Sequence, residues 1–179
     1  MIAAEQQYPW YSLAEGDDLE QGDILESCRV FSPPADLADD SRAEHATFGY
    51  TERDVIVMSQ SCDLVKGRNK LTEVLLCALW RRSECTEGHL STPRGWEDAR
   101  RGNLPAYHVL SECNLPTAAR EVRIVDFRRI YPLPIDFVRR HAASARRIRL
   151  LPPYREHLSQ AFARYFMRVG LPVDIPPFK

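Results

Sequence analysis

The chain has 179 residues, of which 44% are hydrophobic and 27% charged, and its net charge is −1. These values are typical of one globular domain with a sizeable core. No run approaches the roughly 18 apolar residues of a membrane span, and the opening MIAAEQQYPW lacks the basic and apolar regions of a secretory signal. We therefore expect a single domain over residues 1–179, in the cytoplasm and away from any membrane, where thiols stay reduced.

The five cysteines are scattered, and no two of them form a CxxC pair. This spacing argues against a disulfide framework and against a zinc ribbon. A zinc site built from Cys77, Cys85, His89 and Cys113 remains an alternative. Buried cysteines on strands are the favoured interpretation, so we expect no metal and no cofactor.

Charge is distributed unevenly along the chain. Residues 1–54 contain thirteen acidic residues and three arginines, whereas residues 120–168 contain twelve arginines and four acidic residues. Such asymmetry indicates either an anionic partner for the basic segment or a fold in which the two segments neutralise each other.

In chain order, the first predicted element is a strand that follows a turn at Gly22-Asp23 and runs through Phe31. A polar, acidic loop with paired prolines then covers about residues 32–53, long enough to be mobile or functional.

The central strand is predicted over Val55 to Ser59. After a turn, the apolar run at residues 71–82 fits a buried strand better than a short helix, because β-branched residues lie in it and Gly67 precedes it.

The second half of the chain predicts a short helix, three strands and a terminal helix. The short helix, near residues 91–102, has a Ser or Thr cap, Pro93 in its first turn and Gly102 at its end. The strands cover 104–112, 119–133 and 146–151. The terminal helix, about 153–169, has one apolar face, made of Leu158, Phe162, Tyr165, Phe166 and Val169.

This order predicts a mainly β fold with helices, of the α+β class. Five to seven short strands would form a small bent sheet or barrel over about residues 20–150, with one short inserted helix and a C-terminal amphipathic helix. A βαβ fold is excluded because the helices do not alternate with the strands.

Three segments carry a family resemblance: Gly22-Asp23-Ile24 at the entry to the first strand, Val55 to Ser59, and VDFRRIY at 125–131. Together they resemble the PemK/MazF-like toxin family, which implies an SH3-like barrel, single-stranded RNA on its open face, cleavage in active members, an antitoxin-like partner and a homodimer. The acidic first loop and the missing threonine-bearing segment depart from that pattern, so the resemblance supports the fold more than the activity.

The stretch SQSCDL, at residues 59–64, ends the central strand in polar residues. A tight turn after a strand can expose a nucleophile. Cys62 would be that nucleophile, His108 or His45 its base, and Asp63 would orient the base or bind a cation. Alternatively, Cys62 points inward and Asp63 caps the turn through backbone N–H groups.

A phosphate-binding surface is a further hypothesis for the same region. Tyr107, Tyr131 and Trp80 would stack bases on it. Its substrate-binding residues would be Ser59, Gln60, Ser61, Arg68, Lys70 and Arg128.

We expect a non-enzymatic binding or regulatory module on a PemK/MazF-like barrel, in a bacterial toxin–antitoxin or defence context, with single-stranded RNA or a protein as partner. The alternative is a metal-independent ribonuclease or a cysteine-centred hydrolase that uses the Ser59–Asp63 turn.

Overall fold

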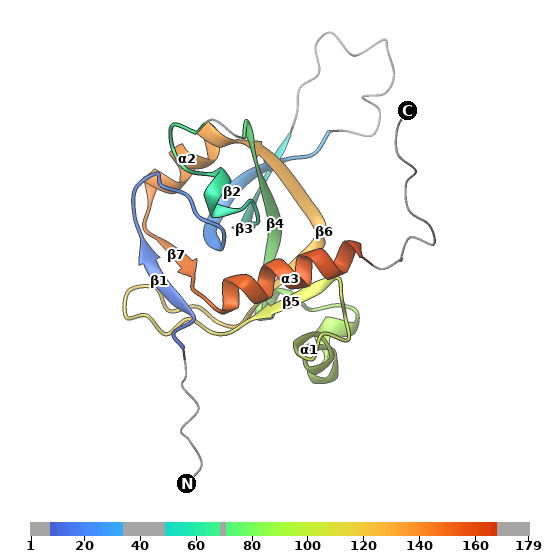
Figure 1. Cartoon of the computed structure of the whole chain (residues 1–179). Coiled ribbons are helices and arrows are strands. Elements are labelled where there is room, and N and C mark those ends of the chain that lie inside the picture. Colours follow the sequence, from blue (N-terminus) through green and yellow to red (C-terminus); the bar gives the residue numbers. More distant parts are fainter. Residues whose placement is uncertain (1–7, 34–48, 69–70, 168–179) are drawn as a thin grey trace, which may run out of the picture.

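The computed structural model describes residues 8–33, 49–68 and 71–167 (Figure 1). In this part of the chain, seven strands form one antiparallel sheet that is accompanied by three α-helices. The strands are β1 (Tyr11–Ala14), β2 (Asp23–Phe31), β3 (Tyr50–Val57), β4 (Glu73–Arg81), β5 (Tyr107–Leu110), β6 (Arg123–Pro134) and β7 (Arg147–Leu150). The helices are α1 (Pro93–Arg100), α2 (Ile135–Ser144) and α3 (Tyr154–Phe166). The predicted mainly β, α+β class is confirmed.

The sheet is open, with the strand order β1-β7-β2-β3-β4-β6-β5. Its edge strands β1 and β5 are not joined by a ladder within the described residues. They nevertheless come close, because the Tyr11 hydroxyl on β1 donates a 2.7 Å hydrogen bond to the carbonyl of Ser111, just after β5. The sheet is therefore curled until its two edges approach each other.

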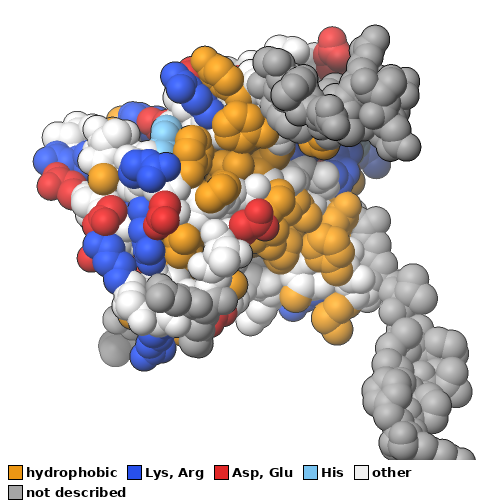
Figure 2. All heavy atoms as spheres, turned by 90° about the horizontal axis from the view of Figure 1, so that it is seen from above, with side chains coloured by type: hydrophobic (Ala, Val, Ile, Leu, Met, Phe, Trp, Pro, Cys, Tyr) orange, Lys and Arg blue, Asp and Glu red, His pale blue; other side chains and the backbone are white. Residues whose placement is uncertain are grey.

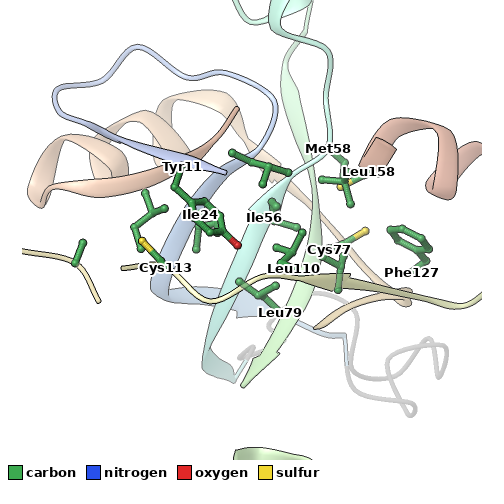
Figure 3. Close-up of a cluster of buried hydrophobic side chains, with 14 residues drawn as sticks. Tyr11, Ile24, Ile56, Met58, Cys77, Leu79, Leu110, Cys113, Phe127 and Leu158 are labelled. Carbon is green, nitrogen blue, oxygen red and sulfur yellow. The ribbon is translucent and has the colours of Figure 1, made fainter. Parts of the chain in front are cut away.

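Alternation along the central strands creates one apolar core on each side of the sheet. Ile56 of β3 lies in the cluster that contains Leu158 of α3, whereas its neighbour Val55 lies in the cluster that contains Val138 of α2. Successive side chains of a strand point to opposite faces, so α3 and α2 cover opposite faces. Figure 3 shows side chains of the α3 cluster, Ile56 among them, converging between the strands.

The α1 segment lies between β4 and β5 and contributes to a third cluster, around Leu90 and Trp96. Thr92 caps the helix, since its hydroxyl oxygen accepts the backbone N–H of Gly95 at 3.1 Å. Position 95 requires a glycine because the backbone of His89 passes close to it: a Cβ at this position would lie 1.9 Å from the carbonyl oxygen of His89. The Trp96 indole donates to the carbonyl of Leu90 at 2.6 Å. These contacts attach α1 to the 3₁₀ turn before it.

Several predicted boundaries differ from the structure. The central strand is Tyr50–Val57 instead of 55–59, so the acidic loop ends before residue 50, and residues 34–48 of that loop lie outside the described residues. Helix α2 was not predicted. The terminal helix is confirmed and ends at Phe166, while the predicted remainder from residue 168 lies outside the described residues.

Ion pairs connect the acidic first part of the chain with the arginine-rich last part. Asp23, fully buried on β2, accepts from Arg147 at 2.8 Å and from Arg149 at 2.5 Å. Glu26 pairs with Arg120 and Arg123, each at 2.7 Å.

The fold therefore brings opposite charges together. This agrees with the second of the two alternatives for the uneven charge, in which the acidic and basic segments neutralise each other. In the view of Figure 2, basic and acidic side chains are interspersed on the left of the molecule. Among the described residues, no helix is long and apolar enough to cross a membrane.

Candidate functional site

The predicted polar turn follows β3 and contains a 3₁₀ turn at Ser61–Asp63. The hydroxyl of Ser59 accepts the backbone N–H of Leu75 at 2.9 Å, and that of Ser61 accepts the backbone N–H of Gln21 at 3.0 Å. The carbonyl of Gln60 accepts the Asp63 N–H at 3.0 Å. Both hydroxyls therefore satisfy backbone donors of neighbouring segments, which is a structural role.

Cys62 is exposed, so the interpretation that it points into the core is wrong. Its Sγ lies 3.6 Å from Oδ1 of Asp63. Asp63 in turn lines a cavity of about 320 Å³, together with Asp136 and Arg139. The turn thus presents a thiol to solvent beside a small polar cavity.

His108, one of the two predicted bases, lies on β5, which β4 and β6 separate from β3 in the sheet. Its ring stacks on Phe127, with centroids 6.4 Å apart. Burial, together with the nearby His157, lowers the pKa of His108 to about 4, so the imidazole is neutral at pH 7. No hydrogen bond joins it to Cys62 within the described chain, and His45 lies outside the described residues.

The predicted phosphate ligands beside the turn are only partly described. Arg68 is exposed just after the turn, and its backbone N–H donates to the Val65 carbonyl at 3.3 Å. Lys70 lies outside the described residues. Lys66 pairs with Asp17 at 2.5 Å.

Arg128 is held by two neighbours. It donates to both carboxylate oxygens of the buried Asp126, at 2.9 and 2.8 Å. Its guanidinium carbon lies 4.6 Å from the centroid of the Tyr107 ring. It belongs to a β6 segment without direct β4 partners, since the register passes from Asp126 to Ile130. Arg128 is thereby fixed beside Tyr107, away from the cysteine turn.

Tyr107 leads to a second candidate site, a cavity of about 540 Å³ between β5, the end of α1 and one side of α3, which we call the β5–α3 groove. Figure 1 shows α3 passing close to β5. The lining of the β5–α3 groove includes three arginines, Arg100, Arg101 and Arg164, and five rings, Trp10, Tyr107, His108, Tyr154 and His157. Among the described residues, no carboxylate lines it.

The rings and charges of the groove are ordered. Trp10 stacks on Tyr154, with centroids 3.6 Å apart and planes 8° from parallel. Glu97 accepts from both Arg100 and Arg101, at 2.7 and 2.6 Å, and so balances one of these two positive charges. Arg164 is exposed and forms no ion pair with any residue that the structure describes. The groove therefore keeps an excess of positive charge next to flat apolar rings.

The sequence did not reveal this groove, because its residues come from three distant segments: Trp10, 99–109 and 154–164. Tyr107 was predicted to stack bases and His108 to act as a base, so the groove includes residues already singled out for other reasons. Within these three segments, the adjacent Arg100 and Arg101 are a local sequence signal of positive charge.

The zinc alternative does not assemble. Cys77 and Cys113 belong to the α3 cluster, whereas Cys85 lies against the α1 cluster. His89 pairs with Asp98 at 3.0 Å instead. In the described ranges, no three His, Cys, Asp or Glu side chains are close enough to hold a metal ion.

Comparison with known proteins adds no relative: no family model matches the chain, and no curated protein matches its sequence.

Proposed function

We propose that the protein is a non-enzymatic binding module for single-stranded RNA and that the β5–α3 groove holds the RNA. The observation that carries this proposal is the lining itself, which combines three arginines with five rings and, among the described residues, no carboxylate. Proteins that bind single strands combine a positive groove with side chains on which bases stack.

The chemistry of the groove favours a nucleic acid over a simple anion. The Trp10–Tyr154 pair offers a flat apolar surface at the groove wall, and stacking of one base on such a ring contributes roughly 1–3 kcal/mol. Arg100, Arg101 and Arg164 supply guanidinium groups for phosphate oxygens. His108 stays neutral at physiological pH because burial lowers its pKa, so it serves as a hydrogen-bonding ring without adding charge.

The PemK/MazF-like barrel remains part of the proposal. The hydrogen bond from Tyr11 to Ser111 supports it, since it holds the two edges of the open, curled sheet close to each other. The resemblance also implies a bacterial toxin–antitoxin or defence context. It further implies a homodimer, and light scattering of the purified protein tests that oligomeric state directly.

The alternative function, cleavage at the Ser59–Asp63 turn, rests on one observation: Cys62 is exposed beside the polar cavity that Asp63 lines. Against it stand the two serine hydroxyls, which are occupied by backbone N–H groups. We therefore rank cleavage second.

Fluorescence anisotropy of a labelled single-stranded RNA, titrated with the protein at two salt concentrations, tests the proposed function. Three phosphate contacts predict that log K falls with log salt at a slope of about −2. Arg164→Ala should weaken binding about tenfold, whereas Arg140→Ala, an exposed arginine on α2 outside the groove lining, should not. A denaturing gel should show intact RNA. Absence of binding, or equal effects of the two substitutions, would contradict the proposal.

A further inference from the structure

A second cavity adjoins the β5–α3 groove. It has a volume of about 490 Å³, and we call it the α1 cavity. It shares Trp10, Arg100 and Val109 with the groove. Each volume alone falls within the roughly 300–1,000 Å³ of small-molecule sites. Two chambers of ligand size therefore meet at these three shared residues.

The α1 cavity is less polar than the groove. Pro93, Trp96 and Val122 form much of its wall, while Arg82 and Arg100 supply positive charge. The Arg82 guanidinium carbon lies 5.6 Å from the centroid of the Trp96 ring. Glu97 also lines the cavity, but it is bonded to Arg100 and Arg101. A flat apolar group with an anionic link toward Arg100 fits this environment.

The backbone of β5 offers hydrogen bonds at the junction. The N–H of Phe127 donates to the carbonyl of Ala106, which sets the alternation of the β5–β6 ladder. His108 lies two residues after Ala106, so its backbone N–H and C=O also point toward β6. The N–H and C=O of the next residue, Val109, therefore point away from β6. Val109 lines both cavities. One backbone donor and one acceptor thus lie on the outer side of the edge strand β5, on a residue that borders both cavities.

We propose that the ligand is a single strand of at least two nucleotides, with one base in the groove, the next in the α1 cavity, and the phosphate between them beside Arg100. This inference rests on the proposed RNA-binding function. Trp10 lies between the two chambers, and the ring face that Tyr154 leaves uncovered is available to one base. A mononucleotide would fill only one chamber, whereas a covalently joined second base binds at high effective concentration.

Binding of a uridine series with one, two and six nucleotides tests the inference, by isothermal titration at one fixed salt concentration. The dinucleotide should bind at least about fivefold more tightly than the monophosphate, the lower end of the effect of stacking one base. Arg82 is exposed and lines only the α1 cavity of the two, so Arg82→Ala should weaken dinucleotide binding more than monophosphate binding and thereby reduce this gain. Arg164 lines only the groove, so Arg164→Ala should weaken binding at every length.

The outcomes separate the two proposals. Equal affinity for one and two nucleotides, with Arg164→Ala still weakening both, would overturn the two-chamber inference and leave the RNA-binding function intact. An equal loss in Arg82→Ala at all lengths would also overturn it, and Arg82→Glu should enlarge the length-dependent loss if the inference holds. If no length binds, both proposals fail.

Discussion

Exposure divides the cysteines at the scale of single residues. Cys28, Cys77 and Cys113 are buried, as expected of reduced cysteines on strands, whereas Cys62 faces solvent. Burial raises the pKa of Cys77 to about 12, which keeps that thiol protonated and unreactive. Of these four cysteines, only Cys62, in the turn after β3, presents an exposed thiol that can react.

Cys62→Ala should therefore leave the free energy of unfolding unchanged within about 0.5 kcal/mol, as is usual for exposed positions. Cys77→Ala, at a position with 0% exposure, should lower it by about 1 kcal/mol or more, comparable with loss of a buried methyl group. Urea denaturation of both variants measures the difference.

The same Cys62→Ala protein distinguishes binding from catalysis. Under the proposed function its RNA affinity stays at the wild-type value, and neither protein cleaves RNA. RNA cleavage by the wild type that disappears in Cys62→Ala would instead support the cysteine-centred alternative.

At the scale of elements, α1 depends on one glycine. A Cβ at Gly95 would meet the backbone of His89, with 1.9 Å to its oxygen and 2.5 Å to its carbon, and backbone atoms cannot rotate away as a side chain can. Gly95→Ala should cost about 1–3 kcal/mol through overpacking. Because α1 carries Arg100 into the groove, RNA binding should weaken as well. Thermal unfolding and anisotropy measure the two effects.

Arg94→Ala is the matched control for that substitution, because Arg94 is exposed on the same helix and lies outside the lining of both cavities. It should change stability by no more than about 0.5 kcal/mol. A Gly95→Ala protein as stable as Arg94→Ala would show that α1 can move away from the turn without cost.

Most elements were predictable because their signals are local. The apolar run that forms β4 and the capped, proline-initiated helix α1 were predicted correctly from the sequence. Helix α2 was not predicted, because Pro132 and Pro134 lie just before it and the strand pattern continues to Leu133. The helical spacing of Ile135, Val138 and Ala142 was nevertheless present, and the latter two are buried.

The candidate site was less accessible to prediction than the fold. Periodicity tells which face of an element is apolar, but it does not tell which distant segments meet. Trp10 and Tyr154 stack although 143 residues separate them, so no spacing rule links them. The exposure of Cys62 likewise depends on the path of the turn after β3, which hydrogen bonds to Gln21 and Leu75 determine.

At the scale of the whole molecule, ion pairs join the acidic beginning of the chain to its basic end. Glu26 on β2 shows the effect most clearly. Its hydrogen bond with Arg120, aided by the charge of Arg123, lowers the pKa of this carboxyl from its ordinary 4.5 to about 2. The uneven charge along the sequence thus serves the fold first, and the groove uses arginines outside these pairs.

This pairing predicts a pH dependence. A carboxyl with a lowered pKa in the folded state stabilises fully above pH 4.5, and this stabilisation is lost as the pH falls from 4.5 toward 2. Urea midpoints measured from pH 6 to pH 2 should therefore fall through this window.

Glu26→Gln should be less stable than the wild type at pH 6, and the difference should shrink as the pH approaches 2. Parallel curves for the two proteins would show that Glu26 does not contribute to the acid sensitivity.

The attachment of α1 also has a consequence for how such a protein diversifies. The segment between β4 and β5 is held by short-range contacts, from Thr92 to Gly95 and from Trp96 to Leu90, and by a small cluster of its own with Ile124 of β6. Substitutions at the exposed Arg100 and Arg101 therefore alter the ligand chambers without touching the two principal cores. Ligand preference can then drift through a single inserted segment while selection for folding acts on the sheet, so we expect this insertion to be where descendants of the fold first diverge in what they recognise.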